Sequence, residues 1–251
     1  MKNSNLYQYI LGIADNSLIL GQRLGELCGH GPNLETDIAC TNISLDLIGQ
    51  TRSYYQYAAK LVENNKTEDD IAFLRLEREY KNVLLVEQPN RHFGFVIMRQ
   101  YLFDVYHYLF LNQLQESKDE TLTAIAKKSL KEVSYHKRFS GDWVKRLGDG
   151  TAESHEKMQE ALNGLWRYTE ELFHTTEADE AMIDEGIGVD VAALKEAYHQ
   201  EVKTLFEEAT LAIPEGNYFT SGGKKGIHSE HMGYLLADLQ YMQRTYPNMT
   251  W

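Results

Sequence analysis

Hydrophobic residues recur at helical spacing over most of the chain, in segments separated by short polar breaks. In the first segment, residues 6–27, apolar side chains return every three or four positions. Residues 28–32 read Cys-Gly-His-Gly-Pro and end it. Asn33 can cap a second helix that reaches about residue 63, because Glu35 and Asp37 suit the positive end of its dipole. This part of the sequence predicts two long helices.

Two more long helices are predicted after a longer connection. Residues 64–91 contain a short helical stretch at about 68–80 and an extended apolar run, 83–86, before Pro89. A third helix covers roughly 92–116, and Ser117 and Glu120 have the spacing of a capping box opening a fourth, which ends near Leu147. One long crossover is typical of a ferritin-like bundle rather than an up-down-up-down bundle. We therefore expect an all-α fold, with a ferritin-like four-helix bundle over about residues 1–150.

Further helical segments follow the bundle, near residues 155–174, 176–185, 190–211 and 227–246. No linker rich in proline, serine or glycine separates them from the first 150 residues. We expect residues 151–251 to form a C-terminal helical extension packed on the bundle, so that residues 1–251 make a single domain.

Composition and charge exclude several classes of protein. The 251 residues carry 37 acidic and 25 basic side chains, a net charge of −12, which argues against non-specific binding of nucleic acid. No apolar run approaches the roughly 20 residues that span a bilayer, and no secretory signal opens the sequence. Two cysteines make neither a disulfide framework nor a zinc quartet. We expect a soluble, cytoplasmic protein without membrane or nucleic-acid partners.

Four acids lie on apolar helix faces, one in each predicted bundle helix: Asp15, Asp46, Asp104 and Glu132. A di-iron carboxylate bundle takes one acid from each of two helices and a Glu-x-x-His pair from each of the other two. Here the two pairs end in Gly49, which has no ligating atom, and in Tyr135, an uncommon ligand. These six positions therefore predict a vestigial di-iron site, in a protein without catalytic residues or a metal of its own.

Buried carboxylates need a counter-charge or a proton. Lys128, His107 and His136 lie within one helical turn of Glu132 or Asp104, and we expect a network of ion pairs and hydrogen bonds where iron would sit. A second set of candidate metal ligands also fits the sequence. Asp104 with His107, and His228 with His231, could bind a metal together with Asp46 and Glu132, although these histidines are also typical of polar packing or surface positions.

A glycine- and lysine-rich loop precedes the last helix, at Gly222, Gly223, Lys224 and Lys225. Backbone N–H groups and ammonium charges at a helix N-terminus suit an anion. The spacing is not that of a phosphate-binding Walker loop. The loop is interpreted either as a flexible basic turn or as a contact with a partner subunit or with a phosphate-rich ligand.

Several longer segments together resemble one protein family. They are residues 20–30 (LGQRLGELCGH), 42–52 (NISLDLIGQTR), 84–90 (LLVEQPN), 131–140 (KEVSYHKRFS), 146–151 (RLGDGT) and 222–228 (GGKKGIH). The chain resembles, over nearly its whole length, the structural, non-metal subunits of bacterial phenylacetyl-CoA monooxygenase, the ring epoxidase (PaaC type).

The resemblance implies a ferritin-like subunit that pairs with a homologous catalytic di-iron subunit and with other components of the oxygenase complex. That catalytic partner would epoxidise the ring of phenylacetyl-CoA with dioxygen and with electrons from a separate NADPH-dependent reductase. The leading hypothesis is therefore a non-catalytic scaffold subunit in aerobic phenylacetate catabolism, with self-association left open. The alternatives are an independent di-iron oxygenase or ferroxidase with atypical ligands, and a helical binding or storage protein.

Overall fold

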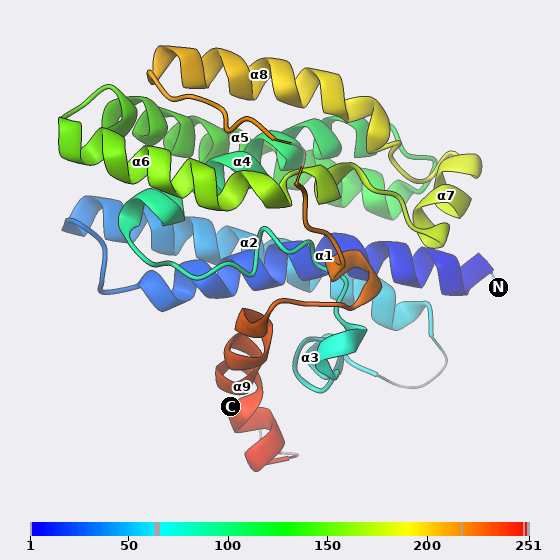
Figure 1. The fold of residues 1–251 in the computed structure, drawn as a ribbon. Helices are drawn as coiled ribbons and strands as arrows, with labels where there is room; N and C mark the ends of the chain where they lie inside the picture. Colours follow the sequence, from blue (N-terminus) through cyan, green and yellow to red (C-terminus); the bar gives the residue numbers. More distant parts are fainter. Residues whose placement is uncertain (1, 63–65, 217, 248, 250–251) are drawn as a thin grey trace.

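The computed structural model describes residues 2–62, 66–216, 218–247 and 249, and within these it is built of helices without a strand. The all-α fold is confirmed, and its order of two helices, crossover and two helices is consistent with a ferritin-like bundle (Figure 1).

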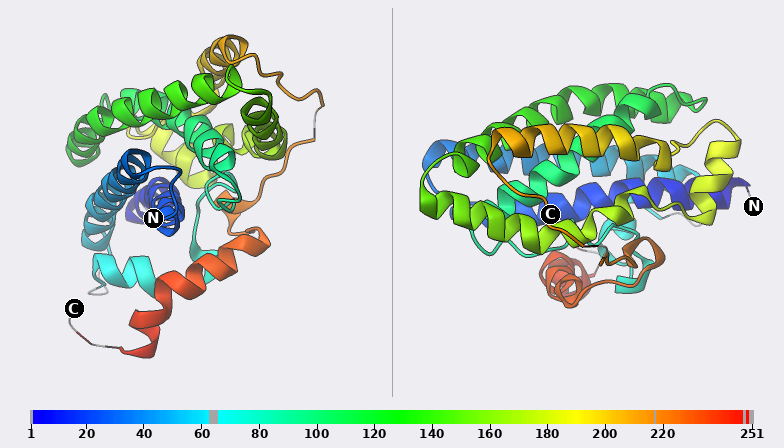
Figure 2. Two further views of the ribbon diagram at one scale, coloured as in Figure 1. Left: turned by 90° about the vertical axis from the view of Figure 1, so that its left-hand side faces the viewer. Right: turned by 45° about the horizontal axis from the view of Figure 1, so that its top comes forward.

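The first pair of bundle helices comprises α1 (Lys2–Leu27) and α2 (Leu34–Lys60), which run side by side (Figures 1 and 2). Asn33 caps α2 as expected, and its side-chain oxygen accepts a hydrogen bond of 2.9 Å from the Thr36 backbone N–H. The Ser44 hydroxyl donates to the Gly21 carbonyl across the pair at 2.7 Å. A side chain at Gly21 would press on α2, because a Cβ there would lie 3.3 Å from Leu47.

The crossover contains a short helix, α3 (Glu68–Phe73), and a 3-10 turn, η1 (Glu77–Glu79). Residues 63–65 lie outside the described part of the chain. The run Val83–Val86 is a turn rather than the expected extended segment, since the Val86 N–H bonds the Val83 carbonyl at 3.3 Å. The run is fully or almost fully buried, and its backbone polar groups find partners in this turn and in polar side chains around it.

The second pair comprises α4 (Phe93–Leu114) and α5 (Glu120–Gly148). The expected capping box is wrong by two residues: Asp119 is the N-cap and accepts from the Leu122 N–H at 2.9 Å. Ser117 instead donates to the Ile187 carbonyl at 2.8 Å, so its hydroxyl anchors the helix start to a later loop. Helix α4 is buried on nearly all sides, which explains why its apolar residues show little one-sided pattern.

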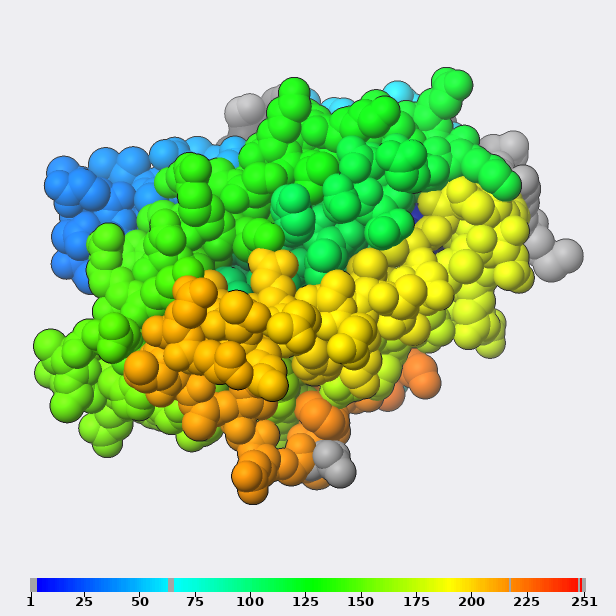
Figure 3. Space-filling model, turned by 90° about the horizontal axis from the view of Figure 1, so that it is seen from above, coloured from blue at the N-terminus to red at the C-terminus, as the bar shows by residue number. Residues whose placement is uncertain are grey.

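The remaining elements surround the bundle. They are α6 (Ala152–Leu165), η2 (Trp166–Tyr168), η3 (Glu170–Phe173), α7 (Glu177–Asp184), η4 (Ala192–Leu194), α8 (Lys195–Glu208), η5 (Gly223–Lys225) and α9 (Glu230–Thr245). Helices α6 and α8 pack against α4 and α5, and α7 packs against α1. Figure 3 shows the yellow and orange segment that includes α8 lying against the green helices.

The C-terminal helix α9 lies apart from the other added helices, beside α3 and η1 (Figures 1 and 2). It begins at Glu230, later than the expected residue 227. One hydrophobic cluster joins the bundle to the added helices, including α9. The organisation of residues 1–251 as a single domain stays a prediction. Among the described residues, no helix is both long and apolar enough to cross a membrane.

Candidate functional site: the polar centre of the bundle

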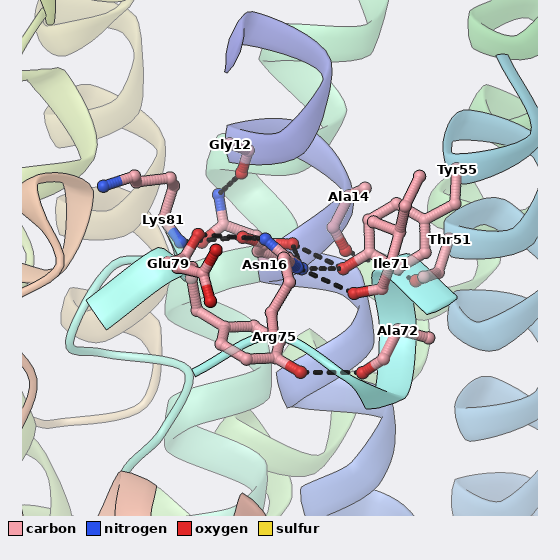
Figure 4. A network of polar contacts seen from close by, with 12 residues as sticks. Gly12, Ala14, Asn16, Thr51, Tyr55, Ile71, Ala72, Arg75, Glu79 and Lys81 are labelled. Atoms are coloured by element: carbon pink, nitrogen blue, oxygen red, sulfur yellow. Dashed lines mark hydrogen bonds and ion pairs between the residues drawn. The ribbon is translucent and has the colours of Figure 1, made fainter. Parts of the chain in front are cut away.

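Asp15 is fully buried on α1, and its carboxylate bonds groups of the crossover rather than the other bundle acids. Figure 4 shows Arg75 and Tyr55 of this network. The Asp15 carboxylate accepts a 3.0 Å bond from Arg75 Nη1, a 2.7 Å bond from the Lys81 backbone N–H and a further bond from the Tyr55 hydroxyl. Both carboxylate oxygens are thus occupied by groups of α2 and the crossover.

Arg75 supplies the counter-charge at this position. Its guanidinium is almost fully buried, and it also bonds the Ile71 carbonyl at 2.7 Å and the Glu79 carbonyl at 3.0 Å. Burial alone would lower the pKa of Arg75, but the Asp15 carboxylate together with Tyr55 and Tyr80 raises this pKa overall. An arginine from a separate segment therefore provides the positive charge at Asp15.

The other three acids lie in a polar centre between α2, α4 and α5. We define it by eight residues: Asp46, Gln50, Gln100, Asp104, His107, Glu132, His136 and Ser140. Asp46 Oδ2 lies 3.0 Å from Nε2 of the fully buried His136, and Gln50 Nε2 donates to Glu132 Oε2 at 2.9 Å. His136 was expected as a cation near Glu132, but its hydrogen-bond partner is Asp46. The expectation for Lys128 is wrong, because its side chain is exposed.

Asp104 is the fully buried carboxyl of this centre. Gln100 Nε2 donates to its Oδ1 and the Ser140 hydroxyl donates to its Oδ2, both at 2.7 Å. Burial raises the pKa of Asp104 to about 7, although His136 and the two hydrogen-bond donors oppose the shift. The carboxyl thus changes its charge near neutral pH.

His107 borders the same centre on α4 and is 3% exposed. Burial, with a smaller effect of the nearby His136, lowers the pKa of His107 to about 3, so its ring is neutral at pH 7. Its Nδ1 atom and that of His136 are buried without a hydrogen-bond partner among the described residues.

The residues present do not fit the two irons that the fold family implies. Asp15 is already bound by Arg75 and Tyr55, and Gly49 offers no ligating atom. Tyr135 is 41% exposed, on the solvent side of α5. Within the described ranges, no group of three or more His, Cys, Asp and Glu side chains has the arrangement of a metal site. A di-iron centre needs converging carboxylates and histidines, which this polar centre does not supply.

The alternative set of metal ligands is also not brought together in the structure. His228 lies at the crossover, where its Nδ1 is 2.9 Å from Glu87 Oε2 and its Nε2 is 3.1 Å from the Tyr80 carbonyl. Burial opposes protonation of His228, but the contact with Glu87 raises its pKa overall. His228 therefore serves to join α9 to the crossover rather than to join Asp104.

The glycine- and lysine-rich loop packs tightly on the crossover. A Cβ at Gly223 would lie 2.1 Å from the Asn82 carbonyl oxygen, so glycine is required there. The buried Glu171 carboxylate accepts bonds from the Gly222 N–H at 2.7 Å and the Leu84 N–H at 2.7 Å. Lys224 Nζ donates to two backbone carbonyls, of Leu172 and His174. The Glu171 carboxylate thus accepts the backbone N–H bond that the loop was expected to offer to an external anion.

Sequence reasoning missed Arg75, Gln50, Gln100 and Ser140. Three of these had a detectable signal, because polar residues repeat four positions apart on the same helix face. The repeats are Asp46 with Gln50, Gln100 with Asp104, and Glu132 with His136 and Ser140. Arg75 had none, since it lies 60 residues from Asp15 in an irregular crossover.

Comparison with known proteins agrees with this architecture. A family model described as phenylacetic acid catabolic protein (PaaA_PaaC) matches residues 1–251. The chain therefore belongs to the phenylacetic acid catabolic protein family. Among curated relatives, it is similar to the C subunit of 1,2-phenylacetyl-CoA epoxidase from Escherichia coli (strain K12). The two are 49% identical over 248 residues, which cover 99% of this chain and 100% of that relative.

Proposed function

We propose that the chain is a non-catalytic structural subunit of a multicomponent phenylacetyl-CoA ring epoxidase, which holds a homologous catalytic di-iron subunit in an assembled complex. The similarity along the full chain to one subunit of such an epoxidase supports membership of the complex. The iron would belong to the catalytic subunit and the NADPH to a separate reductase. The cytoplasm is the expected location for this step of phenylacetate breakdown.

One observation carries the non-catalytic part of the proposal: each bundle acid is bound by a group of the chain itself. Arg75 binds Asp15, His136 binds Asp46, Gln50 binds Glu132, and Ser140 with Gln100 binds Asp104. Such interlocked polar groups are difficult to replace one at a time, because removal of one leaves another buried without a partner. These contacts therefore favour a structural role for the polar centre over a catalytic role.

A protein that works in an assembly also needs a contact surface, and α2 offers an apolar stripe. Leu34, Ile38, Leu45 and Ile48 are 70%, 50%, 60% and 41% exposed. At the helical repeat of about 3.6 residues these four positions share one face of α2. Contiguous exposed apolar surface marks interaction sites more often than free surface. We assign this stripe, Leu34 to Ile48, to the contact with the catalytic subunit.

The first experiment measures iron in the full chain purified alone after iron-replete expression, and its co-purification with the catalytic subunit. We expect near-zero iron, stable pairing, and ring epoxidation only when both subunits are present. Iron at about the di-iron stoichiometry of two per chain would overturn the non-catalytic assignment in favour of an independent oxygenase or ferroxidase. Failure to pair with any catalytic subunit would instead favour an unrelated helical binding protein.

The stripe is tested by Leu45→Glu, with Tyr234→Glu on α9 as the matched control, because Tyr234 is also an exposed apolar side chain, at 76%. A charge at the centre of an interface should weaken pairing by at least about tenfold, whereas the same charge on solvent-facing surface should not. Both variants should keep the wild-type thermal midpoint. Equal pairing of both would refute the assignment of the stripe.

A further inference from the structure

A cavity of about 580 Å³ lies beside the polar centre and shares His107 with it. It opens between the first half of α1, the middle of α4 and the start of α7, and is closed by Lys81 of the crossover and by η5. This volume falls within the range of about 300–1,000 Å³ that is typical of small-molecule sites. The carboxyl groups of the four bundle acids do not line it, but His107 of the polar centre and Lys81, whose backbone N–H bonds Asp15, do.

The inner wall of the cavity is mainly aromatic and aliphatic. It is formed by Tyr9, Ile13, Phe103, Tyr106 and Phe110. His107 adds one polar ring, whose Nδ1 is buried without a partner among the described residues. An aromatic and aliphatic side of this kind suits a flat apolar ring, and the polar residues that line the rest of the cavity can set the orientation of a ligand.

The charged side chains at the mouth of the cavity differ in whether they have partners within the chain. Asp179 accepts from the Thr176 N–H at 2.8 Å as a helix cap, and Glu180 accepts from the Thr175 hydroxyl at 3.2 Å. Glu177 is exposed at the first turn of α7, where the helix dipole favours an acid. The acids of the mouth thus have local structural roles.

Two lysines at the mouth of the cavity differ from these acids, because their charges have no partner of opposite sign among the described residues. Lys81 and Lys225 both line the cavity, and neither forms an ion pair within the part of the chain that the structure describes. Figure 4 shows the Lys81 side chain extending away from Arg75 and its network. Two ammonium groups without a carboxylate partner can receive an anion.

We propose that this cavity binds a small aromatic carboxylate, with its ring between Phe103, Tyr106 and Phe110 and its carboxylate toward Lys81 and Lys225. The site borders the polar centre at His107 and lies apart from the α2 stripe. It gives the chain a ligand of its own, beyond the scaffold role proposed above.

The test uses the full chain and four probes, with binding measured by titration calorimetry. Phenylacetate carries ring and charge, 2-phenylethanol the ring alone, acetate the charge alone, and phenylacetyl-CoA the ring in a thioester. We expect saturable binding of phenylacetate, at least about tenfold weaker binding of 2-phenylethanol, and no measurable binding of acetate. Tighter binding of the thioester than of the free acid would overturn the carboxylate assignment, and no binding of any probe would overturn the site.

Gly12 allows a variant that fills the cavity without disturbing the fold. It lines the cavity in the middle of α1, and a Cβ there would meet no atom within 4 Å. Gly12→Leu should abolish phenylacetate binding and leave the thermal midpoint unchanged or higher, because glycine is a poor helix former. Gly49→Leu is the matched control, since Gly49 is also helical with open space around its Cβ position but lies outside the cavity.

Two further variants test the charge. Lys81→Gln and Lys225→Gln should each weaken phenylacetate binding by about tenfold while leaving 2-phenylethanol unaffected, because only the acid uses the ammonium groups. Unchanged phenylacetate binding in both variants, or retained binding in Gly12→Leu, would refute the site. Because these measurements use the chain alone, pairing with the catalytic subunit is a separate readout: the scaffold proposal stands or falls by pairing and iron content.

Discussion

Arg75→Met removes the positive charge from the Asp15 site while keeping most of the side-chain length. Asp15 is fully buried, and the Arg75 side chain is 5% exposed, so water cannot replace the lost partner. The Tyr55 hydroxyl and the Lys81 N–H would remain, but neither carries a charge. Breaking a buried ion pair by removing one partner costs about 3–5 kcal/mol.

For a domain of this size, 1 kcal/mol shifts the thermal midpoint by about 2–4 °C. The expected fall is therefore roughly 6–20 °C, measured by circular dichroism together with urea unfolding. The control is Arg52→Met, whose guanidinium is 70% exposed and lies 3.6 Å from Glu68. It should cost at most about 1 kcal/mol, because solvent screens surface pairs.

A double-mutant cycle isolates the pair. Asp15→Asn combined with Arg75→Met should be less destabilised than the sum of the two single variants, because the double variant buries no uncompensated charge. Additive losses, or a loss for Arg75→Met no larger than that of Arg52→Met, would refute the assignment of Arg75 as the counter-charge of Asp15.

Three further predictions concern other parts of the chain. Burial raises the pKa of Asp104 to about 7 in the folded chain, against about 3.9 when unfolded, so the ionised carboxylate lowers stability as pH rises between these values. Asp104→Asn should therefore gain stability relative to wild type from about pH 5 to pH 8 in urea unfolding, and a constant difference would contradict this. Gly49→Ala should raise the free energy of unfolding by about 0.5–1 kcal/mol, since its Cβ meets open space in a helix; a lower midpoint would show a hidden clash. Gly223→Ala should lower it by about 1–3 kcal/mol through collision with the Asn82 carbonyl, while the exposed Lys225→Ala in the same loop should not, and equal midpoints would refute the tight packing.

The sequence predicts the long helices well because their apolar residues recur over six or more turns. Short elements depend on a few competing groups and are predicted less well. Ser117 and Asp119 can both cap α5, and the choice falls on Asp119 because the Ser117 hydroxyl bonds the Ile187 carbonyl, 70 residues away. The apolar run at residues 83–86 has a β-branched valine at each end and favours extended backbone locally, yet in the buried crossover it forms a turn.

In the candidate site, too, positions that follow helical spacing were predicted, whereas contacts between distant segments were not. Helical periodicity placed Asp15 and Asp104 in the interior, and both are fully buried. It also suggested His136 as a cation in the bundle, and that side chain is fully buried with its Nε2 3.0 Å from Asp46 Oδ2. Lys128 was expected beside Glu132 and is exposed. The counter-charge of Asp15, Arg75, depends on how the crossover folds back on α1, and no spacing within a helix encodes that contact.

We infer the proposed loss of the di-iron site from the bonding partners of the bundle acids, and not only from the two missing histidines. If only the histidines had changed, the carboxylates would still converge and repel one another, because nearby like charges disfavour ionisation. Instead, Asp15 is bound to Arg75 from outside the four bundle helices, Asp46 to His136, and Asp104 to neutral donors on α4 and α5. Restoring histidines at positions 49 and 135 would meet an α1 acid that is already neutralised by a buried guanidinium. On the scaffold proposal, side chains supply the counter-charges that metal ions supply in a di-iron bundle, and a bundle joined in this way needs no iron to hold its acids together.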